Sequence, residues 1–255
     1  MRFAITREVS PVIGRCELTH LSREPIDVDR ARLQHDGYEG CLRALGCTVH
    51  RLPASPDLPD SVFVEDCAIV LDELAVMARP GAASRRAETA AIEAALASFR
   101  PLGRIELPGT LDGGDVLRVG RTLLVGVSSR TNAAAIDQLG RLVGPVGYSV
   151  GAIEVRGCLH LKSAVTEVAP DTLLVNRAWL PEDAVRGFDC IEIDPAEPFA
   201  ANALRIGDAL VYSSAFPRTR ERLESCGVRV HLVDVSELAK AEGAVTCCSL
   251  IVENV

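Results

Sequence analysis

Hydrophobic and polar residues along the chain repeat one pattern four times. Each copy begins with a small or polar cluster and continues through two β-like apolar runs separated by a turn. It then ends at an arginine that leads into a predicted helix. The four copies begin at Val62, Gly109, Cys158 and Phe199. A fifth copy begins at Gly243 and contains only the first of the two apolar runs.

The N-terminal segment supplies the parts that the fifth copy lacks. Its run FAITRE, from Phe3, is typical of a strand that ends at an arginine. A helix is expected at about 28–45, and TVHRL, from Thr48, is typical of another strand. Apolar residues with helical spacing recur between other units, at 92–99 and, less regularly, at 136–143. Each unit therefore has the predicted order strand–strand–helix–strand.

The spacing of the units predicts a closed ring. Asp66, Gly114, Lys162, Ala201 and Cys247 occupy equivalent positions and lie 48, 48, 39 and 46 residues apart. Such repetition indicates an α/β ring of five units, whose last unit is completed by both ends of the chain. Residues 1–255 would then form a single domain. An open α/β sheet with coincidental similarity between segments is the alternative.

Composition narrows the function classes. With 48% hydrophobic and 24% charged residues, the chain is typical of a soluble globular protein. The excess of 35 acidic over 27 basic residues argues against nucleic-acid binding. Apolar runs are too short for a membrane helix, and the N-terminus lacks the apolar core of a secretory signal. We therefore expect a cytoplasmic protein with no membrane partner.

Nine cysteines are present, an odd number without a C-x-x-C pair. This pattern disfavours a disulfide framework or a structural zinc site. Most of these cysteines are expected to pack as small apolar residues in a reducing compartment. Phosphate-loop, dinucleotide, H-E-x-x-H and G-x-S-x-G motifs are also absent from the sequence.

Polar residues gather instead where the first strand of each unit is predicted to begin. They are Asp60, Glu65, Asp66, Asp112, Asp115, His160 and Cys247. A closed ring would direct these equivalent positions toward one central point. The sequence therefore predicts a polar site on the ring axis.

Cys247 and His160 form the candidate catalytic pair. Because successive strand residues face opposite sides, Cys248 is expected in the core and Cys247 at the ring centre. An inert, buried cysteine is the alternative. Of the five histidines, only His160 opens a unit as Cys247 does, which favours it as an acid or base. The other four are expected at the surface or in packing: His20, His35, His50 and His231.

The clustered carboxylates need a cationic partner, because buried like charges repel one another. These acids could cap turns or bind arginines of the chain, but a guanidinium ligand fits better through paired, charge-assisted hydrogen bonds. Arg85 and Arg130 stand where helices should begin. They could form ordinary salt bridges or bind the carboxylate of an amino acid. Together these features indicate an arginine-like substrate.

Six motifs then carry a resemblance over nearly the whole chain: LPDSVFVED, RPGAASRR, TLDGGDVL, SSRTN, LHLKS and GAVTCCSL. In this order and spacing the sequence resembles the dimethylarginine dimethylaminohydrolase family of the guanidino-group-modifying, or pentein, superfamily. The resemblance implies a five-bladed α/β propeller with pseudo-fivefold symmetry. It also implies hydrolysis of asymmetric dimethylarginine and monomethylarginine to citrulline plus dimethylamine or methylamine. The reaction would pass through a covalent cysteine thiouronium, without a metal or organic cofactor.

The same resemblance assigns the reacting groups. Cys247 corresponds to the nucleophile and His160 to the general acid/base. Asp112 corresponds to the residue that orients His160 and contacts the guanidinium. Glu65 and Asp66 correspond to the other carboxylates on the guanidinium side.

At the amino-acid end of the substrate, the resemblance implies two sets of contacts. Asp60, with the backbone carbonyls of Leu18 and Ala241, would hold the α-ammonium. Arg85 and Arg130 would bind the α-carboxylate.

The resemblance also implies a pocket wall at Phe63 and a mobile lid at Cys16–Arg23. The sequence departs from the family pattern at Glu242, where an aspartate is usual, and at Cys67, which follows the acidic pair. The first departure puts the position of the nearby backbone in question, whereas the second is expected to affect packing only.

Two other functions stay open. One is an arginine deiminase or amidinotransferase of the same superfamily, although those chains are longer than 255 residues. The other is a non-catalytic protein that binds guanidino ligands. An inhibitory zinc ion could bind Cys247 together with His160. A monomer and a homodimer are both compatible with the sequence.

Overall fold

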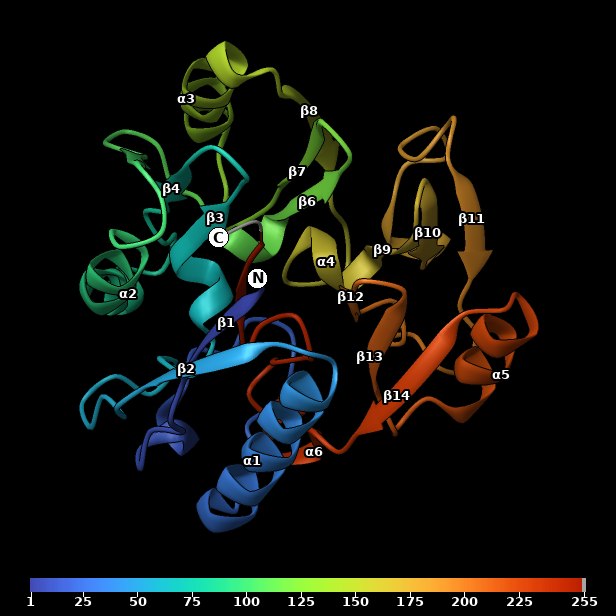
Figure 1. The fold of residues 1–255 in the computed structure, drawn as a ribbon. Helices are drawn as coiled ribbons and strands as arrows, with labels where there is room; N and C mark the ends of the chain where they lie inside the picture. Colours follow the sequence, from blue (N-terminus) through green and yellow to red (C-terminus); the bar gives the residue numbers. More distant parts are fainter. Residues whose placement is uncertain (254–255) are drawn as a thin grey trace.

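The computed structural model describes residues 1–253 as a ring of five three-stranded sheets. Figure 1 shows the sheets arranged around a centre, with the longer helices on the outside. From the inner strand outward, the sheets are β15–β1–β2, β3–β4–β5, β6–β7–β8, β9–β10–β11 and β12–β13–β14. In each sheet, the middle strand pairs antiparallel with the inner strand and parallel with the outer one. The five-bladed α/β propeller is therefore confirmed.

The inner strands are β3 (Ala68–Val70), β6 (Val116–Val119), β9 (Val165–Ala169), β12 (Ala203–Ile206) and β15 (Leu250–Val252). The middle strands are β1 (Phe3–Arg7), β4 (Ala75–Met77), β7 (Thr122–Val127), β10 (Thr172–Val175) and β13 (Ala209–Ser213). The outer strands are β2 (Thr48–Leu52), β5 (Leu102–Arg104), β8 (Ser149–Glu154), β11 (Asp189–Glu192) and β14 (Arg229–Val233). Four units join the middle to the outer strand through α1 (Val28–Ala44), α2 (Thr89–Leu96), α3 (Ala133–Val143) and α5 (Pro217–Ser225). The short helix α6 (Ser236–Ala239) follows β14.

Both ends of the chain build one blade, as the repeat pattern predicts. Strand β15 pairs antiparallel with β1, with Phe3 opposite Val252 and Ile5 opposite Leu250. The predicted fifth run extends to Asn254, which lies outside the described residues together with Val255. The described part of this blade closes the ring.

The unit that begins at Cys158 lacks the predicted helix, so that prediction is wrong. Its arginine leads only into a single 3-10 turn, η6 (Arg177–Trp179), followed by extended Leu180. Pro181 explains the stop, because a proline disfavours helical backbone in the residue before it. The outer strand β11 is reached through a series of turns.

The core lies between the sheets and their covering helices, where apolar side chains have lost contact with water. In α3 the fully buried side chains are those of Ala135, Leu139 and Val143, which follow the helical period. Asn132 caps this helix by accepting a hydrogen bond from the Ala135 N–H at 3.0 Å. Burying one leucine or valine in such a face stabilises the fold by roughly 1.5–3 kcal/mol.

Short helical turns precede three inner strands, and predicted site residues lie in the first of these turns or at the N-caps of the turns. They are η2 (Val64–Cys67), η4 (Gly113–Asp115) and α4 (Leu161–Ala164). The inner strands themselves line a cavity of about 210 Å³ along the axis. That cavity adjoins another of about 580 Å³ at the hairpin ends, and the two share Arg118, Glu167 and Arg205. Among the described residues, no helix has the length and apolar character needed to cross a membrane.

Candidate active site

The predicted polar site is a nearly closed pocket of about 10 Å³ at the end of the axis where the helical turns lie. Its lining residues are Glu17, Asp60, Phe63, Asp66, Arg85, Arg130, Leu159, His160, Ala241, Glu242, Gly243 and Cys247. Eight of the eleven residues predicted for the site are in this lining. Asp112 lies directly behind it, whereas Leu18 and Glu65 belong to neighbouring regions.

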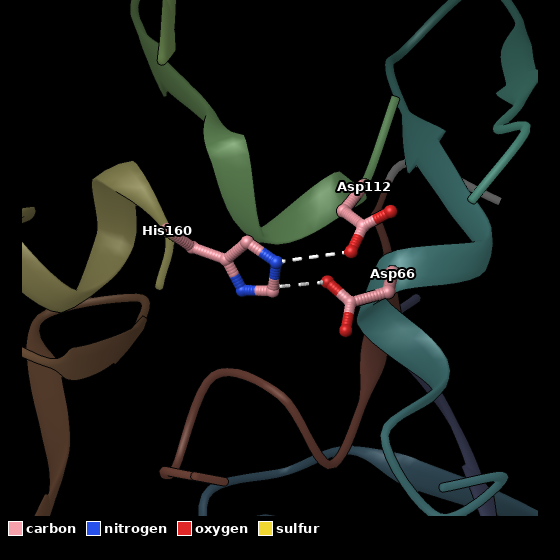
Figure 2. Close-up of side chains that lie close together, drawn as sticks. All are labelled: Asp66, Asp112 and His160. Atoms are coloured by element: carbon pink, nitrogen blue, oxygen red, sulfur yellow. Dashed lines mark hydrogen bonds and ion pairs between the residues drawn. The ribbon is translucent and has the colours of Figure 1, made fainter. Parts of the chain in front are cut away.

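His160 lies between two carboxylates that come from two other blades (Figure 2). Its Nε2 is 3.1 Å from Asp112 Oδ2, and its Nδ1 is 3.9 Å from Asp66 Oδ1. All three side chains are buried. Gly114 makes this approach possible, because a Cβ there would lie 2.5 Å from His160 Nδ1. The backbone N–H of Gly114 also donates to Asp66 Oδ1 at 2.9 Å.

The carboxylates decide the charge of His160. Burial disfavours the imidazolium, but Asp66, Asp112 and Asp115 together outweigh it and raise the pKa of His160 to about 9. Asp66 in turn has its pKa held well below the ordinary range, because His160 and the Arg85 guanidinium overcome its burial. At neutral pH the free pocket therefore holds a protonated His160 facing an ionised Asp66.

Cys247 faces the pocket and Cys248 packs in the core, as predicted, but both residues lie in the turn before β15 and not in a strand. The Ala244 N–H donates to Cys247 Sγ at 3.4 Å. Burial and the carboxylates of Glu65 and Asp66 raise the pKa of Cys247 to about 12. The free site therefore holds a neutral thiol, and a cation placed beside it would favour the thiolate.

Arg85 is engaged with the protein's own acids. Its guanidinium donates to Asp66 Oδ2 at 2.6 Å and to Glu88 Oε2 at 2.9 Å. Two further hydrogen bonds reach the carbonyls of Asp60 and Phe63, at 3.4 and 3.2 Å. These bonds support a wall of the pocket and fix Asp66 in front of His160.

Arg130 has fewer strong partners. Its Nη2 donates to Thr19 Oγ1 at 3.1 Å, and its Nη1 is 3.9 Å from Asp112 Oδ2. The side chain is buried and lines the pocket. Arg130 can therefore exchange its contact with Thr19 for one with an anionic group.

Glu65 points away from the pocket, although Asp66 points into it. Its carboxylate accepts from Lys162 Nζ at 2.5 Å and from Thr246 Oγ1 at 2.8 Å, and it lines the axial cavity. Burial nevertheless raises the pKa of Glu65. The Glu65–Lys162 pair thus lies between the axial cavity and the segment that carries Cys247. The sequence pattern offers Lys162 only as a repeat position, without a signal for this pairing.

The segment predicted to form a lid, Cys16–Arg23, lies beside the pocket, and Glu17 is part of the lining. Backbone N–H groups of Thr19, His20 and Leu21 all donate to the carboxylate of Glu242. The Glu17 N–H donates to Asp60 at 3.1 Å. Leu18 lies between these tethers and packs against the core beside α1.

Glu242 is a site residue whose anchoring role sequence analysis missed. Its φ of 57° lies in the left-handed region, which places the side chain toward the lid. Gly243 follows because a Cβ there would meet the Phe63 ring at 2.2 Å. The sequence signal for this arrangement is the Glu242–Gly243 pair just before the cysteines.

Asp66, Asp112 and His160 also satisfy the spacing of a metal site, with one ligand atom from each within 4.8 Å of the others. Asp66 is already ion-paired with Arg85 at 2.6 Å, so a metal would compete with that bond. Zinc at Cys247 and His160 stays a prediction.

Comparison with known proteins connects this geometry to a family. The sequence profile of the family described as arginine deiminase matches residues 54–197. An N(G),N(G)-dimethylarginine dimethylaminohydrolase from Streptomyces coelicolor is 41% identical, over 97% of this chain and 95% of that protein. The enzyme of the same name from Pseudomonas aeruginosa is 36% identical, over 91% of each chain.

The solved structures agree. The Pseudomonas aeruginosa enzyme, as a cysteine-to-serine mutant complexed with citrulline, superposes with a TM-score of 0.92 and 34% identity over 98% of both chains. A histidine-to-glycine variant of a dimethylarginine dimethylaminohydrolase, in an adduct with S-methyl-L-thiocitrulline, gives 0.92 and 33% over the same shares. The chain therefore belongs to the dimethylarginine dimethylaminohydrolase family of the pentein superfamily.

Proposed function

We propose that this protein hydrolyses Nω-methylated arginines to citrulline and dimethylamine or methylamine. The observation that carries the proposal is the meeting of Cys247, His160 and Asp66 in one nearly closed pocket that Arg130 also lines. The two relatives named for this activity and the bound citrulline of the Pseudomonas aeruginosa enzyme support it.

Substrate binding would prepare the nucleophile. A guanidinium placed beside Asp66 and Asp112 brings a positive charge to Cys247, whose thiol is neutral in the free site. That charge favours loss of the thiol proton to solvent. The resulting thiolate lies beside the guanidinium carbon as soon as the substrate is in place.

His160 then moves the protons of the two chemical steps. The Cys247 sulfur forms a bond to the guanidinium carbon, which gives a tetrahedral adduct. The bond from carbon to the methylated nitrogen breaks as the imidazolium of His160 gives its proton to the leaving amine. A covalent thiouronium remains on Cys247.

Hydrolysis releases the product. Neutral His160 takes a proton from water, and the hydroxide adds to the thiouronium carbon. The carbon–sulfur bond breaks as the carbon–oxygen double bond forms, the hydroxyl proton passes to the departing sulfur, and citrulline leaves a neutral Cys247 thiol. General acid–base assistance of this kind contributes about 10²–10⁴-fold to the rate.

We propose that the rest of the pocket holds the amino-acid end of the substrate. Asp60 and the backbone carbonyls of Leu18 and Ala241 would accept hydrogen bonds from the α-ammonium. Arg130 would bind the α-carboxylate, with Arg85 beside it. Phe63 would form a wall against the methylene chain, and Glu65 would act from behind the pocket through its charge.

The test is citrulline release from asymmetric dimethylarginine. We expect turnover by the wild type and none by Cys247→Ser, whose hydroxyl is a much weaker nucleophile. Cys248→Ser is the matched control, because its neighbouring thiol packs in the core. It should keep measurable activity. Full activity in Cys247→Ser would overturn the mechanism.

The arginine deiminase profile match over residues 54–197 favours one alternative, deimination of unmethylated arginine. Parallel assays with arginine and dimethylarginine distinguish the two activities. Turnover of neither substrate by a folded wild-type protein would favour a guanidino-binding protein instead.

Further expectations accompany this proposal. Residues 1–255 should behave as one domain, so that limited proteolysis leaves no stable fragment of one or two blades. Zinc inhibition through Cys247 and His160, a monomeric or dimeric state, and a cytoplasmic location stay predictions.

A further inference from the structure

Asp115 is a fully buried carboxylate that no step above uses. It ends the turn η4, three residues after Asp112. Its Oδ1 accepts a hydrogen bond from the Leu161 N–H at 2.9 Å, and its Oδ2 accepts from Ser128 Oγ at 2.6 Å. Gly126 leaves room for it, because a Cβ there would lie 2.7 Å from Asp115 Oδ1. One carboxylate therefore joins two segments from different blades.

Each of these segments carries a site residue next to the contact. Leu161 directly follows His160, so the bond to its N–H fixes the backbone at the histidine. Ser128 precedes Arg130, and its Oγ accepts from the Arg130 N–H at 3.0 Å and from the Thr131 N–H at 3.2 Å. Thr131 Oγ1 in turn accepts from the Asp112 N–H at 3.2 Å.

We propose that Asp115 is a positioning residue that couples the placement of His160 to the placement of Arg130. The proposal rests on the function above, in which these two residues act at opposite ends of one substrate. Through Asp115, the reacting end and the carboxylate-binding end keep a fixed separation. The substrate is then held at the length at which its guanidinium carbon meets Cys247.

The hydrogen-bond polarity of Ser128 makes this coupling testable. Its Oγ uses both acceptor sites on backbone N–H groups, and its own hydrogen goes to Asp115. In Asp115→Asn, the amide oxygen can still accept from Leu161, but the amide nitrogen is a donor and faces a hydroxyl with no free acceptor site. The hydrogen bond from Ser128, which is the arm toward Arg130, is then lost, although the Thr131 side chain also hydrogen-bonds Asp115. The hydrogen bond from the Leu161 N–H, which is the arm toward His160, is kept.

The experiment combines steady-state kinetics for Ser128→Ala, Asp115→Asn and their double variant. Ser128→Ala should raise KM about tenfold, the loss expected for one or two hydrogen bonds, with kcat changed less than twofold. Asp115→Asn should raise KM similarly. The double variant should have no higher KM than either single variant, because both substitutions break the same arm. Additive effects on KM would overturn the coupling.

Asp115→Asn should also change the pH profile, unlike Ser128→Ala. The charges that face His160 are Asp66, Asp112 and Asp115, with Arg85 and Arg130 beside them. Removing the negative charge of Asp115 makes the protonated form of His160 less stable, so the alkaline limb of the kcat profile should move to lower pH. An unchanged profile would show that the charge of Asp115 does not act on His160, and it would overturn the coupling.

Two controls separate this idea from a general loss of structure. Ser129→Ala alters an exposed neighbour in the same loop and should keep the wild-type KM. Ser128→Thr keeps the hydroxyl and should restore a near-normal KM. A purely structural role would instead lower the melting temperature and kcat while leaving KM unchanged, which would overturn the proposal.

Citrulline affinity measured by calorimetry gives a readout that needs no turnover. Wild type that binds citrulline but releases none from dimethylarginine would overturn the proposed function alone. Ser128→Ala that binds citrulline as tightly as the wild type would overturn the role of Asp115.

Discussion

Two buried histidines lie beside carboxylates, yet at neutral pH one is uncharged and the other is cationic. His35 on α1 is 2% exposed, with Nδ1 at 3.7 Å from Glu39 Oε1. His160 is 5% exposed and contacts Asp112 at 3.1 Å. Burial lowers the pKa of His35 to about 4. At His160 the surrounding acids outweigh burial and raise the pKa to about 9.

The neighbours of each carboxylate explain the difference. Glu39 accepts from Arg51 at 2.6 Å, from Arg43 at 2.9 Å and from Thr6 at 2.6 Å. Its charge is therefore already balanced before His35 is considered. Asp112 has its nearest arginine, Arg130, only at 3.9 Å. A buried histidine becomes a candidate acid when the acids around it outnumber their own cationic partners.

The largest expected effect is a loss of kcat that occurs when His160 is replaced but not when His35 is replaced. His160→Asn should lower kcat for citrulline release by about 10²–10⁴-fold, because an amide cannot carry the protons. His35→Asn should keep kcat and lower the free energy of unfolding by about 1–3 kcal/mol, as a buried ring is lost. Turnover assays and urea unfolding on both variants check this. A comparable fall of kcat in His35→Asn would break the comparison.

A second prediction concerns stability against pH. His160 has a raised pKa in the fold, so its contribution is fully present below about pH 6.5 and is lost as the pH rises through about 9. His35 has a lowered pKa in the fold, so the unfolded chain binds its proton first as the pH falls. The free energy of unfolding therefore decreases as the pH falls from about 6.5 toward 4. Urea unfolding of the wild type and both asparagine variants across this range measures the two terms.

The variants identify each term. The stability difference between wild type and His160→Asn should shrink on the alkaline side. The difference between wild type and His35→Asn should shrink on the acidic side. The reverse order would show that the charges of the two histidines have been assigned wrongly.

The smallest expected effect tests whether the arginine partners of Glu39 help to keep the pKa of His35 low. Arg51→Gln removes one cation from Glu39, which should raise the pKa of His35 because the freed carboxylate favours the imidazolium. Stability should fall by only about 1 kcal/mol, since Arg51 is partly exposed and Glu39 keeps Arg43 and Thr6. Histidine ring signals followed by NMR against pH measure the change. Arg104→Gln, on an exposed arginine, should leave His35 unaltered.

Much of the fold could be predicted because each blade of the ring corresponds to one copy of a repeated sequence pattern. Each unit needs two apolar runs and a turn to build an inner hairpin, and the sequence shows these directly. The N-terminal run FAITRE is needed to complete the blade that holds Cys247, and β1 occupies that place. The predicted helix after Arg177 does not form because of Pro181. The prediction relied on the repeat pattern and gave this proline too little weight.

The sequence did not predict in which direction each side chain of the site points. Glu65 and Asp66 are neighbours in sequence, yet the tight turn η2 sends one to Lys162 and the other to His160 and Arg85. Periodicity gives no direction inside such a turn. The partners themselves come from other blades, so no local pattern could pair Lys162 with Glu65.

Because β15 closes the ring, the first blade and the pocket stay incomplete until the last described residues have been synthesised. A nascent chain extended only through α6 already contains His160, Asp66 and both pocket arginines, but it lacks Cys247. Strand β1 meanwhile has an unpaired edge, which a ribosome-bound chain must leave open to solvent or to a chaperone. Cys247, the proposed nucleophile, is followed directly by the strand that covers this edge. The segment that carries Cys247 therefore joins the pocket together with the strand that closes the propeller.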